Sequence, residues 1–404
     1  MTASAKPCKS VPQALTIAAL LDGYRSHRFT VSEALTSVLE RIDQAPEKHV
    51  WIARLPRERV LAYARALDAK APDSLPLYGV PFAIKDNIDL EGIPTTAGCP
   101  DYSYLPAASA YVVQRLIDAG AVPVGKANLD QFATGLVGTR SPYGACQNSF
   151  DDAWISGGSS SGSAVAVATG LVSFSLGTDT AGSGRVPAAF NNIIGLKPTC
   201  GHLSTSGVVP ACQSIDCVSI FALTCDDAAR VASVAGAYDR ADPYSRVAPA
   251  TGNCAVAKGF TFGVPRADQL EFFGDTEYER LFTESVRRLE SVGGRRVDID
   301  FAPFRVAASL LYDGAWIAER YVAVGAFIES MPQSVYPVTR QLIEASRNLT
   351  AADAFRSQHR LMEAKRAATE AWGDIDVMLT PTAAPPTESP KSMRTPFAST
   401  RRSV

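Results

Sequence analysis

The chain has 404 residues, of which 46% are hydrophobic and 20% charged, a composition typical of a globular protein with a substantial core. The 39 basic and 41 acidic residues give a formal net charge of −2, which argues against a nucleic acid or membrane surface as a partner bound through bulk charge. The longest apolar run, 164–176, is too short and too often interrupted to span a bilayer, and residues 1–12 carry no apolar segment typical of a signal peptide. We therefore expect a cytoplasmic protein.

The cysteines agree with that expectation. No CxxC pair occurs, so neither a zinc site nor a thioredoxin-like redox motif is predicted. Scattered cysteines in a chain without a predicted signal peptide are typical of a protein in a reducing compartment. The eight positions are Cys8, Cys99, Cys146, Cys200, Cys212, Cys217, Cys225 and Cys254.

Helix and strand patterns alternate along the first half of the chain. Thr30 and Glu33 have the spacing of a capping box, which predicts the start of a helix over 30–42. Alternating strands and helices predict an α/β fold in which helices cover a largely parallel sheet. The further elements are strands over 80–84, 121–124 and 172–176 and helices over 110–119 and 163–169.

The second half is mainly helical. The patterns are helical over 276–292, 304–328 and 351–372 and predict a short strand over 377–379. The segment 240–257 is richer in Pro, Asp, Gly and Ala taken together and is expected to be a surface connection. From residue 384 the composition changes to Pro, Ser, Thr and Arg without apolar periodicity. We expect one domain over 1–383 and a disordered tail over 384–404.

A Gly/Ser run over 157–163 stands directly before the small-residue helix. Alone it is compatible with a flexible linker, although a linker is not expected to lead straight into a packed helix. It also fits a GxSxG nucleophile elbow centred on Ser160, but the preceding strand is weak and the chain has only four histidines. A phosphate-binding loop is disfavoured because no lysine follows the glycines.

Two further positions are candidates for chemistry. Lys85 ends an apolar strand, where it is either an ordinary surface lysine or a buried amine whose pKa is lowered until it can act as a base. The segment 180–184 follows another strand, and its small residues allow either a tight turn or several backbone N–H groups aimed at one point. The residues alone do not choose between these interpretations.

Together these segments resemble the amidase signature family. The motifs are 79–87, 157–164 and 177–183, and Ser159 and Ser183 stand 24 positions apart, as in that family. The resemblance extends over about 77–382 and implies the amidase signature fold, a mixed, largely parallel sheet with helices on both faces. It also implies hydrolysis of linear amides by a Ser-cisSer-Lys triad.

The resemblance assigns a role to each motif. Ser183 would be the nucleophile, Ser159 the proton relay that follows a cis peptide bond, and Lys85 the base. The backbone N–H groups of Thr180, Ala181, Gly182 and Ser183 would form the oxyanion hole. No metal or organic cofactor is implied.

Within the family, the stretches 128–136, 138–144 and 183–192 are most similar to allophanate hydrolases. This similarity implies that the substrate is allophanate, a small-molecule amide, that ammonia is released, and that Tyr312, Arg320 and Gly135 bind the substrate. Tyr312 and Arg320 are eight positions apart, so we expect them near one face of a helix, where an arginine fork suits a planar carboxylate. An ordinary amphipathic helix remains the alternative.

The similarity further implies a urea carboxylase as pathway partner and is compatible with a homodimer. The chain departs from the family in two respects. The sequence does not include the second domain of full-length allophanate hydrolases. The amidase domain of the family normally continues past 376–382, so we expect the domain over 1–383 to be incomplete at its C-terminal end. Another small-amide hydrolase, an inactive truncated remnant and a glutaminase-type amidotransferase subunit therefore remain alternatives.

Overall fold

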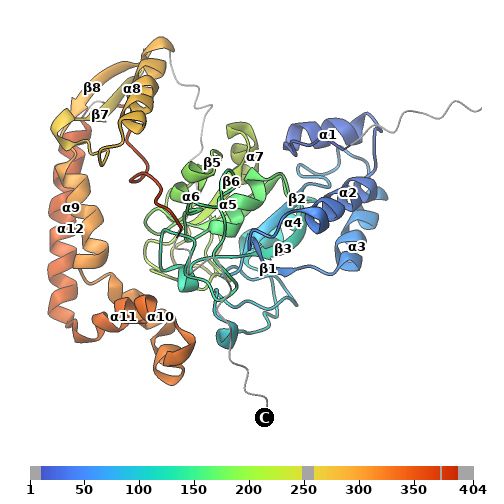
Figure 1. Cartoon of the computed structure of the whole chain (residues 1–404), viewed down its shortest axis with the longest axis horizontal. Helices are drawn as coiled ribbons and strands as arrows, with labels where there is room; N and C mark the ends of the chain where they lie inside the picture. Colours follow the sequence, from blue (N-terminus) through green and yellow to red (C-terminus); the bar gives the residue numbers. More distant parts are fainter. Residues whose placement is uncertain (1–10, 248–258, 374, 390–404) are drawn as a thin grey trace, which may run out of the picture. The chain divides into compact units, whose positions relative to one another are not determined.

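The computed structural model describes residues 11–247, 259–373 and 375–389 and divides the chain into two compact units (Figure 1). The first unit holds the described residues up to 247 together with 331–336 and 388–389. The second holds the described residues of 259–330 and 337–387. None of the described helices is long and apolar enough to cross a membrane.

A six-stranded sheet forms the centre of the first unit, with strand order β1-β3-β2-β4-β6-β5. The three central strands β3, β2 and β4 pair in parallel, and the flanking pairs β1–β3, β4–β6 and β6–β5 are antiparallel. The α/β prediction is confirmed, and the parallel pairing belongs to the centre of the sheet. The strands are β1 Trp51–Arg54, β2 Pro81–Lys85, β3 Val122–Ala127, β4 Phe174–Thr178, β5 Ile194–Leu196 and β6 Val218–Ala222.

The parallel register decides which side chains meet. Ile84 pairs with Leu176 across β2 and β4, and Lys85 pairs with Ala127 across β2 and β3. The carboxyl ends of parallel strands lie at one edge of a sheet, where ligand sites of open α/β folds form. Lys85 and Thr178, the last residues of β2 and β4, are therefore neighbours at that edge.

Helices pack around this sheet. The capping box of Thr30 and Glu33 is present at the start of α2, and the apolar face of this helix is buried as its periodicity predicts. Helix α5 contacts β2, β3, β4 and β6, and a Cβ at Gly162 would lie 2.3 Å from the Val50 carbonyl oxygen, so a small residue is required there. The helices of this unit are α1 Ile17–Arg25, α2 Val31–Gln44, α3 Arg57–Asp68, α4 Tyr111–Asp118, α5 Ser161–Ala168, α6 Arg185–Phe190 and α7 Cys225–Ala235.

The second unit contains a three-stranded parallel sheet, β8-β7-β9, and five α-helices among its described residues. The predicted helices over 276–292 and 351–372 and the short strand near 377 are confirmed. The elements are β7 Thr261–Pro265, α8 Thr276–Ser291, β8 Arg295–Ile299, α9 Ala302–Asp313, α10 Ile317–Ser330, α11 Pro337–Glu344, α12 Ala351–Trp372 and β9 Val377–Met378.

The helical pattern predicted over 304–328 is confirmed, but two helices share it. Helix α9 ends at Asp313, and α10 begins at Ile317. Gly314 closes α9 by donating its N–H to the Leu310 carbonyl at 3.0 Å, and the next amide, of Ala315, donates to the Ser357 hydroxyl at 3.0 Å instead of continuing the helix. Apolar periodicity continues across the break, which is why the sequence pattern does not reveal it.

Two predicted segments fall partly outside the described residues. Of the surface connection 240–257, the structure describes 240–247. Of the expected tail 384–404, it describes 384–389, in which Glu388 bridges to Trp154 and the Ser389 N–H donates to the Ala153 carbonyl at 2.7 Å. The remainder of both segments lies outside the described residues.

Candidate active site

Lys85 is a fully buried lysine at the carboxyl end of β2. Its Nζ donates to Ser159 Oγ at 2.7 Å and to Thr178 Oγ1 at 2.7 Å. The structure therefore excludes an ordinary surface lysine. The amine is held between two hydroxyl groups, each of which can accept a hydrogen bond from it and can also donate one.

Ser159 lies in the Gly/Ser run and is also fully buried. The peptide bond between Gly158 and Ser159 is cis, as the resemblance implies. The Asp130 N–H donates to the Ser159 carbonyl at 3.0 Å, while the Asp130 carboxylate accepts from the backbone N–H groups of Val137, Gly138 and Arg140. Asp130, which the sequence analysis did not identify, thus joins the loop 130–140 to the segment that carries Ser159.

Gly158 has to be glycine at this junction. A Cβ on it would lie 2.1 Å from Asp130 Oδ2, a separation that real Cβ atoms do not show. Gly135 meets the same carboxylate, since its Cβ would lie 2.6 Å from Asp130 Oδ2. The requirement for glycine at 135 therefore has a packing cause, and the predicted contact of Gly135 with substrate stays a prediction.

Ser160, the centre of the GxSxG pattern, connects the Gly/Ser run to Thr178 and Ser183 through hydrogen bonds. Its hydroxyl donates to the Thr178 carbonyl at 3.1 Å and accepts from the Thr178 N–H at 3.2 Å. Its backbone N–H donates to the Ser183 carbonyl at 3.4 Å. These bonds place the Ser159 segment beside the loop that carries Ser183, and they leave the Ser160 hydroxyl engaged at the end of β4, which argues against a nucleophile elbow.

Ser183 lies in the loop 179–184 between β4 and α6 and is 5% exposed. Asp179 organises this loop: its buried carboxylate accepts from the Gly182 N–H at 2.7 Å and from the Arg185 guanidinium through two bonds of 2.9 Å. Burial by itself raises the pKa of Asp179, but the Arg185 charge and the hydrogen bonds outweigh it and hold the pKa below its usual range. The loop is thus closed around an ionised carboxylate.

A second carboxylate holds the same loop from the other side. Thr180 Oγ1 donates to Asp216, whose other oxygen accepts from the backbone N–H groups of Ala211 and Cys212 at 2.9 and 3.0 Å. Within the described part of the chain, no protein group accepts from the backbone N–H of Thr180, Ala181 or Ser183, whereas the Gly182 N–H is engaged by Asp179. Of the four amides assigned to the oxyanion hole, the one of Gly182 is thus held by a carboxylate, and the role of the four toward an oxyanion stays a prediction.

A buried ion pair, which no sequence motif indicated, lies beside Lys85. Lys126 Nζ on β3 lies 3.3 Å from Asp86 Oδ1, and both side chains are fully buried. Asp86 also accepts from the Thr96 N–H at 3.0 Å, and Lys126 donates to Thr95 Oγ1 at 3.0 Å. Burial raises the pKa of Asp86 and lowers the pKa of Lys126, while their mutual attraction opposes both shifts.

The two residues expected to bind a substrate carboxylate lie in the second unit. Tyr312 is in the last turn of α9 and is 48% exposed, whereas Arg320 is in α10 and is 3% exposed. The expectation that they share a face of one helix is wrong, because the chain breaks at Gly314 between them. Their role toward substrate stays a prediction.

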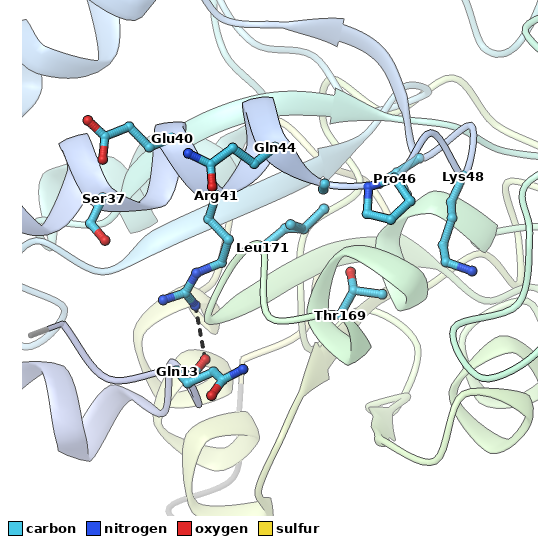
Figure 2. Close-up of a pocket in the computed structure, with 11 residues that line it drawn as sticks. Gln13, Ser37, Glu40, Arg41, Gln44, Pro46, Lys48, Thr169 and Leu171 are labelled. Atoms are coloured by element: carbon cyan, nitrogen blue, oxygen red, sulfur yellow. Dashed lines mark hydrogen bonds between the residues drawn. The ribbon is translucent and has the colours of Figure 1, made fainter.

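A separate pocket in the first unit is shown in Figure 2. Arg41 points toward Gln13, and its guanidinium donates to the Gln13 carbonyl at 2.9 Å. None of the lining residues is Lys85, Ser159 or Ser183, so this pocket is distinct from the site described above. It is lined by Gln13, Ser37, Glu40, Arg41, Gln44, Ala45, Pro46, Lys48, Val50, Thr169 and Leu171.

Comparison with known proteins adds a family and several relatives. The family model described as Amidase matches residues 33–402, most of the chain, and continues past residue 384, where the composition changes. The urea amidolyase of Lachancea kluyveri is 46% identical over 352 residues, which cover 86% of this chain and 19% of that protein. The chain thus spans about a fifth of the length of the urea amidolyases it matches.

Solved structures and a second class of enzyme are similar as well. The crystallised allophanate hydrolase of Kluyveromyces lactis has 44% sequence identity and a TM-score of 0.86, and the match covers 91% of this chain and 61% of that one. One subunit of the glutamyl-tRNA(Gln) amidotransferase from Maridesulfovibrio salexigens is 33% identical, with 85% of this chain and 68% of that protein covered.

Proposed function

Because this chain belongs to the amidase family, we propose that it hydrolyses the C–N amide bond of allophanate, urea-1-carboxylate, with release of ammonia. The observation that carries the proposal is the 2.7 Å hydrogen bond from the buried Lys85 amine to Ser159, in a segment bonded to the Ser183 loop. The similarity to an allophanate hydrolase over 91% of the chain favours this substrate.

The arrangement supports acyl transfer through a serine nucleophile. Ser183 Oγ attacks the amide carbonyl, and its proton passes through Ser159 Oγ to the neutral Lys85 amine. Backbone N–H groups of the loop 180–183 stabilise the oxyanion that forms on the carbonyl oxygen. The proton returns along the same path to the leaving nitrogen, ammonia departs, and water hydrolyses the acyl-enzyme to free Ser183.

Substrate selection is assigned to Tyr312 and Arg320. The planar guanidinium of an arginine matches a carboxylate in geometry and charge, and a phenol adds one hydrogen bond. Allophanate carries such a carboxylate at the end opposite its amide. Tyr312 is half exposed and so accessible to a ligand, and Arg320 is a buried arginine on α10, the next helix of the same unit.

Ammonia release from allophanate tests the function. The wild-type chain is expected to release ammonia, and Ser183→Ala is expected to release none above the uncatalysed rate while unfolding at the same temperature. Ser233→Ala, which changes an exposed serine on α7, is the matched control and is expected to keep full activity. Undiminished ammonia release by Ser183→Ala would eliminate the proposed nucleophile.

A glutaminase-type amidotransferase subunit is the second candidate, favoured by the 33% identity to one subunit of a glutamyl-tRNA(Gln) amidotransferase. Assays on allophanate, malonamate, biuret and glutamine under the same conditions separate the two. A preference for glutamine would replace allophanate hydrolysis with this alternative. A preference for malonamate or biuret would instead indicate another small-amide hydrolase.

We infer two further relationships of the chain. A urea carboxylase is the proposed pathway partner, because carboxylation of urea produces allophanate. Addition of that enzyme with urea, bicarbonate and ATP should sustain ammonia release that stops without it. The chain is also proposed to form a homodimer, which light scattering of the purified protein tests.

A further inference from the structure

Two cysteine side chains meet near the end of β5. Cys217 Sγ donates to Cys200 Sγ at 3.4 Å, and the Cys200 and Cys217 thiols also lie 3.5 and 3.4 Å from the carbonyls of Ile215 and Pro198. Disulfide sulfurs are about 2.05 Å apart, so the two sulfurs need to approach by about 1.4 Å to form a bond. Both cysteines are reduced in the structure.

The surroundings of this pair favour a reactive thiolate. Cys200 is partly exposed, whereas Cys217 is buried. The hydrogen bond from Cys217, which outweighs the opposing effect of burial, together with the charges of Lys197 and Arg246 lowers the pKa of Cys200 to about 6. Arg246 is held nearby, since its N–H donates to the carbonyl of Gly201 at 2.8 Å. Reactive cysteines are typically found in such partly exposed, electropositive places.

The cysteine pair is also connected to the loop that carries Ser183. The Cys217 carbonyl accepts from the Asp179 N–H at 2.8 Å, and Asp216, its neighbour in sequence, accepts from Thr180. Val218, the next residue, pairs with Thr178 across β6 and β4. Displacement of Cys217 therefore acts on 178–180, the residues that lead into Ser183.

We propose that Cys200 and Cys217 form a redox-sensitive dithiol whose oxidation to a disulfide by a peroxide changes the loop 178–183 and lowers the activity of the site. The Cys200 thiolate attacks one peroxide oxygen, the O–O bond breaks, and hydroxide leaves as Cys200 becomes a sulfenic acid. The Cys217 sulfur then attacks the Cys200 sulfur and displaces the oxygen as water. In total, two thiols lose two hydrogens and hydrogen peroxide is reduced to two waters; a thiol reductant reverses the reaction.

The covalent part is tested without substrate. The full chain is treated with hydrogen peroxide, and its peptides are mapped by mass spectrometry without reduction. A peptide pair joined through Cys200 and Cys217, absent in Cys200→Ser and Cys217→Ser and abolished by dithiothreitol, is the expected result. Cys225→Ser, which changes the exposed cysteine at the start of α7, is the control and should retain the linked pair. Recovery of Cys200 only as sulfinic acid or as a free thiol would overturn the proposal.

The effect on the loop has its own readouts. Hydrogen exchange of peptides covering 176–186 should change on oxidation in the wild type and not in Cys200→Ser. Amidase activity should fall reversibly in the wild type and in Cys225→Ser, but not in Cys200→Ser or Cys217→Ser; this last readout rests on the proposed function. Unchanged exchange in fully disulfide-linked protein would refute the coupling. A chain that never hydrolyses an amide, yet forms the disulfide and shows altered exchange, would refute only the proposed function.

Discussion

The ammonium group of Lys126 lies 3.3 Å from the carboxylate of Asp86, and neither side chain is exposed. Asp86 directly follows Lys85, and Lys126 pairs with Ile84, the residue that precedes Lys85, across β3 and β2. One member of the ion pair therefore follows Lys85 in the chain, and the other lies beside it on the neighbouring strand. We interpret Lys126 and Asp86 as positioning residues that act on the site through Lys85.

Lys126→Met is expected to destabilise the chain by about 3–5 kcal/mol, because it leaves the buried Asp86 carboxylate without its charge partner. Urea unfolding measures the change. The double variant Lys126→Met/Asp86→Leu removes both charges and should recover a large part of the lost stability. If the loss of unfolding free energy in the double variant equals the sum of the losses in the two single variants, the two charges are not coupled and the predicted recovery is wrong.

Lys85→Met is expected to lower kcat by about 10²–10⁴-fold at every accessible pH, because it removes the proposed general base. Lys85→Arg should not restore activity, since a guanidinium does not give up its proton in this range. Thr178→Val removes the other hydroxyl that accepts from Lys85 at 2.7 Å and should cost much less activity. The kcat of each variant is measured from pH 6 to 10. An arginine variant with near wild-type kcat would contradict the role of Lys85 as base.

The Asp179 carboxylate should stabilise the fold in a pH-dependent way. Its pKa in the folded chain lies below the ordinary value of about 3.9, so its contribution is fully present above that value and is lost as pH falls through the folded pKa. The difference in free energy of unfolding between wild type and Asp179→Asn should therefore be constant from about pH 5 to 8 and shrink below about pH 4. Denaturant titrations at several pH values measure it. A difference that grows toward acid pH would contradict the assigned direction.

Thr180→Val is expected to lower stability by about 1.5 kcal/mol, since a hydrogen bond to the Asp216 carboxylate is lost. A loop that holds Ser183 less firmly should also reduce kcat by roughly tenfold, the equivalent of about 1.4 kcal/mol. Thr180→Ser keeps the hydroxyl and should restore both quantities. If the serine variant is as impaired as the valine variant, the methyl group and not the hydrogen bond is what matters.

Tyr312→Phe removes only a phenol oxygen from a half-exposed side chain and should leave the fold intact. If this hydroxyl binds the substrate carboxylate, KM for allophanate should rise by roughly tenfold while the KM for an uncharged amide such as biuret stays the same. Steady-state kinetics on both substrates provide the comparison. Equal changes for the two substrates would argue against carboxylate recognition by Tyr312.

Local patterns in the sequence predicted much of this protein. The capping box at Thr30 and the buried strand ending at Lys85 are determined within a few residues, so they are readable from the chain alone. The three motifs around Lys85, Ser159 and Ser183 identified the family. By contrast, the break at Gly314 depends on Ser357, some forty residues away. The Ser357 hydroxyl accepts a hydrogen bond from the backbone N–H of Ala315.

Only the tertiary structure decided which partners the serines of the Gly/Ser run bind. The sequence placed Ser160 at the centre of a nucleophile motif, but in the fold its hydroxyl is bonded to Thr178. The partners of Asp130, Asp216 and Lys126 come from other strands and loops, and burial together with strand register, which no local pattern encodes, brings them into contact. The sequence by itself determined the family and the residues proposed to carry the chemistry, whereas long-range pairing in the sheet decided which of them meet.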